Sequence, residues 1–476
     1  MLQSSLFSAK MRAAMRIHLR LLSACAPHAV VAFLCSCLVA AAAGQVKARY
    51  LRFEEVQETL RLNADSGLPG SEIQGSEAWD HWIRARDAEV RGRIDRGIED
   101  SISNLILYGT SFTALPRVES IEHAASESGD ITAATLARIH ALAMALPASA
   151  RNERVRFVRD FLVRKGIARN STETFFTENL RRFIAEEAEY QKKLKDAENA
   201  ADPNEVFLAR GTLFETRGLS VDTSLLPNFA LEETLRAMVG KGVLAPGSMH
   251  RIALIGPGLD FTDKRDGYDF YPLQTLQPFA VLEAVARLGL GKAEDVQVVC
   301  LDLNSAVIAH VTRLEAQGRA GRPYTVQLPR NLQAEWSPAA VSYWESFGNI
   351  LGSPVKPLPV PSGVSGVVAR AVTIRPLYAA HVQVYDANIV AQTLDLPTGQ
   401  GFDLVIATNV LVYYDRFQQA LAMANVARML NRGGIFLANN VLPAQHTNVL
   451  EYLGRRTTSY TPSGAYGDDV VVYRRR

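Results

Sequence analysis

Residues 252–260 constrain the fold more than any other part of the chain. Four apolar residues, 252–255, suit a buried parallel strand and run directly into Gly256-Pro257-Gly258. Because glycine has no Cβ, the chain can turn sharply at Gly256, and a ligand can lie against bare backbone. In an open α/β sheet, ligands bind outside the carboxyl ends of the strands, where this turn would lie. The segment therefore predicts an α/β sheet in which residues 256–258, the glycine turn, are either a nucleotide-binding loop or a plain strand-to-helix turn.

Beyond the glycine turn, apolar strand-like segments alternate with helical ones as far as the C-terminus. We expect helices over 305–317 and 417–430, and strands over 296–301, 402–408, 435–438 and 469–473. This alternation is typical of βαβ units and a mainly parallel sheet. Between about 319 and 372 the pattern is interrupted by prolines and aromatic residues. We expect an insertion there, either a substrate-facing subdomain or lid, or a passive surface excursion.

The half of the chain before the glycine turn has a different pattern of apolar and charged residues. Apolar residues recur at three- and four-residue spacings through charged sequence, which predicts a helical domain over 46–200. Residues 201–249 then read as a connecting segment to an α/β domain over 250–476. The 51 Lys and Arg residues nearly balance the 49 Asp and Glu residues, so no nucleic-acid partner is expected.

Residues 1–45 have the layout of a secretory signal peptide. Basic residues up to Arg20 precede the apolar segment 21–43, which ends in small residues. The segment is also long enough to span a bilayer uncleaved, and a buried helix of a soluble domain is the third reading. We therefore expect a membrane-anchored or exported protein with membrane association through 21–43. A cytoplasmic domain is expected if the segment is an uncleaved anchor with the domain inside, or if the true start lies downstream.

Two polar groups follow strand-like segments downstream of the glycine turn. Asp302, which precedes Leu303, can accept hydrogen bonds from both hydroxyls of a ribose, and its alternative role is a helix N-cap. Asp386-Ala387-Asn388 follows an alternating apolar segment. Its carboxylate and amide could read the amino group and a ring nitrogen of adenine, although Asp-x-Asn is also an ordinary turn.

The C-terminal half carries a family resemblance. A Phe402-Asp403-Leu-Val strand, a helix, then Gly433-Gly434 and another strand resemble the class I S-adenosylmethionine-dependent methyltransferases. Within that class, residues 408–414 and 385–388 are most similar to the glutamate O-methyltransferases of bacterial chemotaxis receptors.

The resemblance implies a Rossmann-like seven-stranded α/β sheet whose last strand is antiparallel, preceded here by the helical domain. It implies S-adenosyl-L-methionine as cofactor, with the glycine turn beside its methionyl part, Asp302 on the ribose and Asn409 to Tyr413 near the sulfonium. The predicted cofactor-binding residues are Gly256, Pro257, Gly258, Asp260, Asp302, Leu303, Asp386, Ala387, Asn388, Asn409 and Tyr413.

Two positions depart from the family pattern. Leu254 stands where an acidic residue is usual. Asp260 stands at the third glycine position, from which we expect its carboxylate to reach the ammonium group of the cofactor. We predict a methyltransferase acting on a small-molecule, lipid or protein carboxylate acceptor. The departures keep open a catalytically inactive methyltransferase-like protein that binds cofactor or a partner. A third alternative is a nicotinamide-dependent dehydrogenase. Such an enzyme would require the motif Gly-x-Gly-x-x-Gly, whereas residues 256–261 are Gly-Pro-Gly-Leu-Asp-Phe.

The sequence singles out no catalytic base. Tyr413, Tyr268 and Asp263 are candidates, and the polar loop that follows Asp260 is either a clamp over the methyl group or a solvated loop. No histidine or cysteine spacing suggests a metal site.

Overall fold

A computed structural model describes residues 46–63, 73, 75–126, 129–198, 214, 217–262, 268–439 and 449–476. Residues Ala48–Arg476 form one compact unit. The expected signal peptide or anchor, 1–45, lies outside the described residues and stays a prediction. Within the described ranges, no helix is long and apolar enough to cross a membrane.

Seven strands form the main sheet: β2 (Arg251–Ile255), β3 (Gln297–Asp302), β7 (Val382–Asp386), β9 (Phe402–Ala407), β10 (Leu430–Ala438), β11 (Leu450–Ser459) and β12 (Gly467–Arg475). Their order is β11-β12-β10-β9-β2-β3-β7. The strands from β10 to β7 are parallel, whereas β12 runs antiparallel to both of its neighbours. The expected Rossmann-like seven-stranded sheet with an antiparallel last strand is therefore confirmed.

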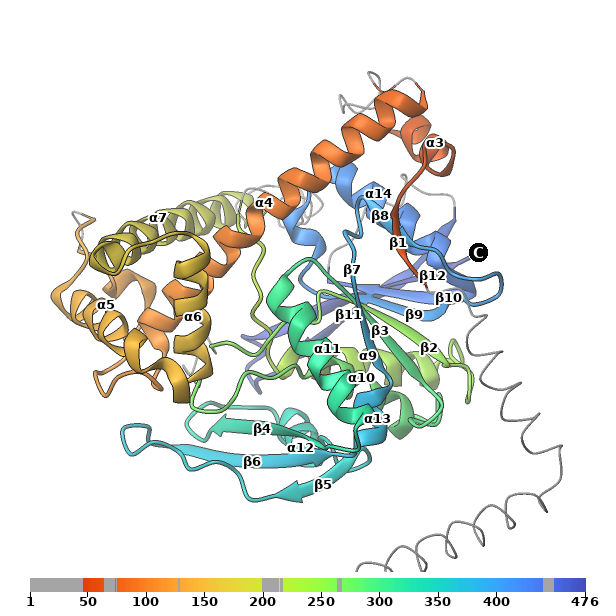
Figure 1. Ribbon diagram of the computed structural model, residues 1–476. Coiled ribbons are helices and arrows are strands. Elements are labelled where there is room, and N and C mark those ends of the chain that lie inside the picture. Colours follow the sequence, from red (N-terminus) through yellow and green to blue (C-terminus); the bar gives the residue numbers. More distant parts are fainter. Residues whose placement is uncertain are drawn as a thin grey trace, which may run out of the picture. The chain divides into compact units, whose positions relative to one another are not determined.

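Helices cover both faces of this sheet (Figure 1): α9 (Leu226–Gly240), α10 (Gln277–Arg287), α11 (Ser305–Arg319), α13 (Pro376–Ala380) and α14 (Arg416–Met429). Ile252 and Leu254 of β2 belong to the same buried core as Phe229 of α9 and Phe279 of α10. Because side chains alternate along a strand, Ala253 faces the other side of the sheet, where α14 lies. Burial on both faces explains why the central strands read as continuous apolar runs.

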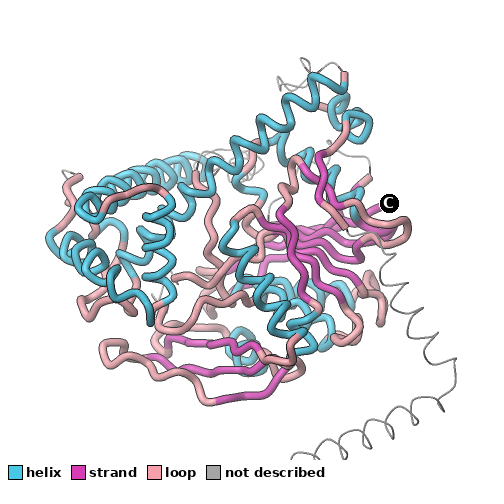
Figure 2. Tube along the Cα trace, in the orientation of Figure 1, coloured by secondary structure: helices cyan, strands magenta, loops and turns pink. Residues whose placement is uncertain are grey.

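Residues 46–198 are mostly helical, with α3 (Phe53–Leu62), α4 (Ser76–Tyr108), α5 (Ala133–Ala145), α6 (Glu153–Arg164) and α7 (Thr172–Glu198). Helix α4 is the long axis of this region, with α3 at one end and α5, α6 and α7 grouped at the other (Figures 1 and 2). The sequence did not indicate the short strand β1 (Ala48–Tyr50), which pairs antiparallel with β8 (Gln392–Leu394). Three residues are too few to show an alternating pattern.

The expected insertion, 319–372, contains a small antiparallel sheet rather than irregular chain. Its three strands, in the order β4-β6-β5, are β4 (Tyr324–Asn331), β5 (Gly352–Val355) and β6 (Val367–Ile374), and α12 (Pro338–Ser346) lies between β4 and β5 in sequence. Figure 2 shows this sheet as a separate group of strands from the main sheet. The insertion is thus a structured subdomain with its own hydrogen-bonded backbone.

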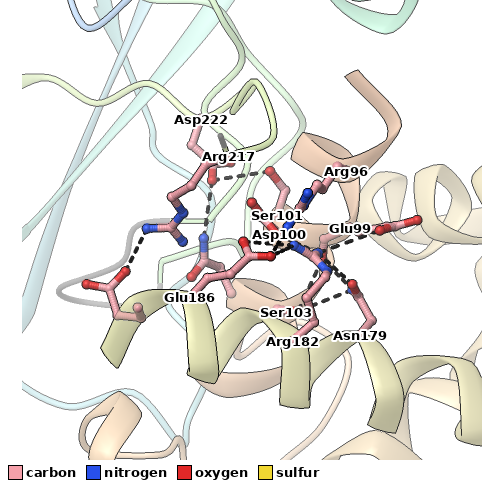
Figure 3. A network of polar contacts seen from close by, with 12 residues as sticks. Arg96, Glu99, Asp100, Ser101, Ser103, Asn179, Arg182, Glu186, Arg217 and Asp222 are labelled. Atoms are coloured by element: carbon pink, nitrogen blue, oxygen red, sulfur yellow. Dashed lines mark hydrogen bonds and ion pairs between the residues drawn. The ribbon is translucent and has the colours of Figure 1, made fainter. Parts of the chain in front are cut away.

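A polar network joins α4 to α7 (Figure 3). Arg182 of α7 donates to Asp100 of α4 at 2.6 Å and forms a second ion pair with Glu186 at 3.1 Å. Burial raises the pKa of Asp100, and Arg182 opposes that rise. Arg182 therefore compensates a carboxylate that would otherwise be buried without an opposite charge.

Arg182→Met is expected to destabilise the protein by about 3 kcal/mol, because it leaves the buried Asp100 carboxylate without its cation. Urea unfolding followed by circular dichroism measures the change. The control is Arg61→Met, which removes an exposed pair with Glu58 and should cause no measurable change. Equal stability of the two variants would contradict a stabilising role for the network.

Candidate functional site

The glycine turn follows β2 and depends on two left-handed glycines. Gly256 has φ 66° and Gly258 has φ 65°, and the Gly256 N–H donates to the Leu301 carbonyl at 2.8 Å. A Cβ on Gly256 would lie 2.7 Å from Val410, and one on Gly258 would lie 2.8 Å from the Val221 carbonyl oxygen. Glycine is thus required at both positions. The side of each glycine on which a Cβ would lie faces protein atoms rather than an exposed ligand surface.

The chain that crosses the glycine turn comes from the connecting segment before α9. The Leu259 N–H donates to the Val221 carbonyl at 2.7 Å, and the Thr223 N–H donates to the Leu259 carbonyl at 3.0 Å. These paired backbone groups hold residues 221–223 beside the turn. The sequence predicted only a connecting segment here, since nothing in its composition indicated a pairing partner.

A cavity of about 510 Å³ opens at this edge of the sheet. Its volume lies within the range of roughly 300–1,000 Å³ that is usual for small-molecule sites. The predicted site residues that line it are Gly256, Gly258, Asp260, Asp302, Leu303, Ala387, Asn409 and Tyr413. The structure therefore brings together side chains and backbone from the ends of β2, β3, β7 and β9.

Asp302, at the end of β3, is a partly buried acid in the wall of this cavity. Burial raises its pKa to about 7, although backbone N–H groups of Asn304, Leu303 and Gly258 donate to the carboxylate and oppose the rise. The alternative role as a helix N-cap is wrong, because the cap of α11 is Asn304, whose side chain accepts from the Ala306 N–H at 2.9 Å. Asp302 is therefore available to a ligand in the cavity.

Two further polar atoms in the cavity wall have no hydrogen-bond partner within the described chain. They are Nδ2 of Asn304 and Oγ1 of Thr262, and both residues are buried, with exposed fractions of 5% and 3%. Both atoms are themselves fully buried, so they lie behind the cavity surface rather than on it. Nothing in the sequence pattern distinguished these two residues.

Asp386 and Asn388 do not reach the cavity, contrary to the sequence-based expectation for their side chains. The Asp386 carboxylate accepts from Arg91 at 2.8 Å, and the Asn388 amide donates to Asp87 at 2.9 Å. Both partners lie on α4, some three hundred positions away in the chain, and sequence spacing could not reveal them. Ala387, between the two, does line the cavity. Pro257 is likewise not among the residues around it.

Asp260 is held by its own loop. Its Oδ2 accepts from the Tyr271 hydroxyl at 3.0 Å and from Gln274 Nε2 at 2.8 Å. Buried Arg154 of α6 donates to the Asp260 carbonyl at 2.9 Å. The helical region thus fixes the position of this side of the cavity, a role that the sequence did not indicate for Arg154.

The polar loop after Asp260 is also attached to the helical region. Asp269 accepts hydrogen bonds from the backbone and hydroxyl groups of Thr110 and Ser111, including 2.8 Å from the Thr110 N–H. Residues 268–274 are therefore neither a purely solvated loop nor a clamp that is detached from the helical region. Asp263, one of the candidate bases, lies outside the described residues.

Tyr268 and Tyr413, the two tyrosine candidates for a catalytic base, both line the cavity. Burial raises the pKa of Tyr413 to about 12, so its phenol is protonated at neutral pH and is a poor general base. Arg93 of α4 donates to the Tyr413 carbonyl at 2.8 Å. Asn409 has φ 57°, the single left-handed residue other than glycine in the described chain, and such backbone strain often accompanies functional sites.

Comparisons with known proteins provide no close relative. No protein-family model matches the sequence, and no curated protein matches it. Among solved structures, the chain is similar to the N-methyltransferase NodS from Bradyrhizobium japonicum, at 13% identity over 52% of this chain and 97% of NodS, with a TM-score of 0.26.

A second similar structure is magnesium protoporphyrin IX methyltransferase from Synechocystis with bound S-adenosylmethionine, at 11% identity over 60% of this chain and 91% of that chain, with a TM-score of 0.26. A TehB-like S-adenosylmethionine-dependent methyltransferase from Corynebacterium glutamicum follows at 12% identity over 53% and 90%, with a TM-score of 0.25. At these identities and scores, function has to be inferred from the sheet and the site of this chain itself.

Gly258→Ala is expected to destabilise the protein by about 3 kcal/mol, because a left-handed alanine is strained and its Cβ collides with the Val221 carbonyl. Gly289→Ala is the matched control: Gly289 has φ 67° and open space around the Cβ position, so only the backbone strain of about 1 kcal/mol applies. Urea unfolding compares them. A Gly258→Ala variant as stable as Gly289→Ala would mean that residues 221–223 are not held against the turn.

The raised pKa of Asp302 predicts a pH-dependent stability. The neutral carboxyl stabilises the fold fully below the usual pKa of 3.8, and this contribution is lost as the pH rises through about 7. Asp302→Asn should therefore be more stable than the wild type at pH 8, by about 2 kcal/mol, and similar to it at pH 4. Urea midpoints at both pH values measure this. A wild type that is the more stable protein at pH 8 would contradict the burial of the carboxylate.

Proposed function

We propose that this chain is an S-adenosylmethionine-dependent methyltransferase. The observation that carries the proposal is the partly buried carboxylate of Asp302, which lies beside the glycine turn in a cavity at the carboxyl ends of the parallel strands. Ligands of open α/β sheets bind at this edge, and an acid at the end of the second strand is suited to a ribose. The resemblance of residues 402–437 to class I methyltransferases supports the same conclusion.

The residues of the cavity fit such a cofactor. Asp302 would accept from the ribose hydroxyls. Ala387 and Ile389, in place of the side chains of Asp386 and Asn388, would contact the base. When bound, S-adenosylmethionine supplies a methyl group already activated by its sulfonium.

The protein's own contribution to methyl transfer would be proximity and alignment. Walls from three parts of the chain enclose the cavity, which would hold an acceptor in line with the methyl group and exclude water. Tyr413, with its pKa of about 12, would donate a hydrogen bond rather than remove a proton. The acceptor must then carry a nucleophile that needs little or no activation by a base of this chain.

A second candidate is a catalytically inactive protein that binds the cofactor. The specific observation in its favour concerns Asp260, at the position of the usual third glycine. Its carboxylate already accepts hydrogen bonds from Tyr271 and Gln274. Leu254, where an acid is usual, is fully buried in the core. Both candidates require cofactor binding, and only the first requires transfer of the methyl group.

Asp302→Ala should weaken binding of S-adenosylhomocysteine about a hundredfold in isothermal titration calorimetry, because two hydrogen bonds to a charged carboxylate are lost. Asp386→Ala is the matched control. Asp386 is the register neighbour of Asp302 on the next strand, but its carboxylate lies on Arg91 outside the cavity, so affinity should stay within about twofold.

Two outcomes would decide against the proposal. Equal effects of the two substitutions would mean that the cavity is not the cofactor site. Binding without transfer of a labelled methyl group from S-adenosylmethionine to any acceptor in a cell extract would favour the inactive binding protein.

A further inference from the structure

Residues 217–224 of the connecting segment, here called the strap, form one side of the cavity. Every residue from 219 to 224 lines it. The strap is not a strand of the main sheet, and it is joined to the glycine turn only by the backbone pairing around Leu259. Its first residues therefore need a second support, and the contacts of α4 supply one.

The strap crosses α4 in direct backbone contact. A Cβ on Gly97 of α4 would collide with the Leu219 carbonyl oxygen, and a Cβ on Gly218 would collide with the Gly97 nitrogen. The Leu219 N–H donates to the Arg93 carbonyl at 3.3 Å. Glycine at both crossing positions allows the strap to lie on α4 without an intervening side chain.

Arg93 of α4 binds the strap and a second wall of the cavity at the same time. Its Nε and Nη2 donate to the Arg217 carbonyl at 2.9 and 2.7 Å, and Nη2 also donates to the Phe214 carbonyl at 3.1 Å. Its Nη1 donates to the Tyr413 carbonyl at 2.8 Å. Phe214 and Tyr413 line the cavity, and Arg93 stands behind them. One guanidinium thus connects the start of the strap to residues 409–414, the loop after β9.

The chemistry of the guanidinium suits it to this connection. In the described hydrogen bonds of the Arg93 side chain, every acceptor is a carbonyl oxygen. Burial lowers the pKa of Arg93, and these acceptors offset the cost of burying its charge. The donors of a guanidinium form a rigid planar fork, whereas the ammonium of lysine is a single point donor. Arginine can therefore fix the spacing between two backbone segments, which lysine cannot.

We infer that Arg93 is a positioning residue for the cofactor, because it fixes the strap and the 409–414 loop on opposite walls of the cavity before the cofactor binds. The inference rests on the proposed function and makes the helical region part of it. Walls that are fixed in advance lower the entropic cost of binding, and their loss acts mainly by speeding dissociation. Arg93 forms no described hydrogen bond with the glycine turn or with Asp302, so its substitution leaves those groups in place.

The first test measures binding of S-adenosylhomocysteine to the full-length protein by calorimetry, and its dissociation by a chase of labelled ligand. Arg93→Met should weaken binding about tenfold, mainly through faster dissociation. Arg93→Lys should weaken it at least fivefold, because one ammonium cannot reach both segments. Arg93→Lys keeps the charge and one hydrogen bond, so it remains informative if Arg93→Met does not fold.

Arg287→Met is the matched control. Arg287 is a partly buried arginine of α10, and its partners lie outside the cavity: Glu283 at 2.9 Å, Glu232 at 3.5 Å and the Ser346 hydroxyl at 2.7 Å. Its loss should lower the urea midpoint, while the affinity for S-adenosylhomocysteine stays within about twofold. If Arg93 had only a structural role, its variants would resemble Arg287→Met in both measurements.

Hydrogen exchange without cofactor tests the connection itself. The Leu219 and Thr223 amides donate to the Arg93 and Leu259 carbonyls. In Arg93→Lys these amides should exchange at least tenfold faster than in the wild type, because the start of the strap is released from α4. In Arg287→Met they should exchange at the wild-type rate.

Three results would overturn the inference. They are wild-type affinity in both Arg93 variants, equal loss of affinity in Arg287→Met, and wild-type exchange of the strap amides in Arg93→Lys. Failure of the wild type to bind S-adenosylhomocysteine rejects the proposed function itself. The two failures are distinguishable, because the affinities of the variants are compared with a wild type that binds.

Discussion

The backbone pairing of Leu259 with Val221 and Thr223 is the interaction on which the site depends. It closes one side of the cavity with a segment from before the sheet, and the absence of a Cβ at Gly258 allows that approach. Through Asp260 and Gln274 the same stretch is tied to the insertion. A chain that lost this pairing would retain its parallel strands, but the cavity would be an open sheet edge rather than an enclosed site.

The helical half of the protein supports the site rather than standing apart from it. Arg154, Arg91 and Arg93 reach from helices α6 and α4 to the loops at the ends of the strands, mostly by donating to carbonyls or to the Asp386 carboxylate. A buried arginine can hold several carbonyls at once because its donors form a fixed fork. The network around Arg182 then holds α4 against α7, so the position of these arginines depends on helix packing.

Asp302 and Tyr413, which both line the cavity, differ in protonation at neutral pH and therefore suit different roles. Asp302 is a partly buried carboxylate whose pKa lies near 7, so a ligand that donates to it can stabilise the charged form at physiological pH. Tyr413 is held protonated by burial. This pairing of a titratable acceptor with a fixed donor is suited to binding and orienting a nucleoside. In the proposed function, the chemical activation would come from the sulfonium of the cofactor.

The sequence alone determined the architecture, because strand runs, helix periodicity and glycine turns are local properties of adjacent residues. The mainly parallel α/β sheet, the glycine turn at the end of β2 and the acid at the end of β3 followed from such patterns, whereas the number of strands followed from the family resemblance. Only the tertiary structure decided which polar side chains face the cavity. Asp386 and Asn388 bond to α4 instead, whereas residues of the connecting segment and of the insertion line the cavity. Those outcomes depend on contacts between residues far apart in the chain, which no local spacing encodes.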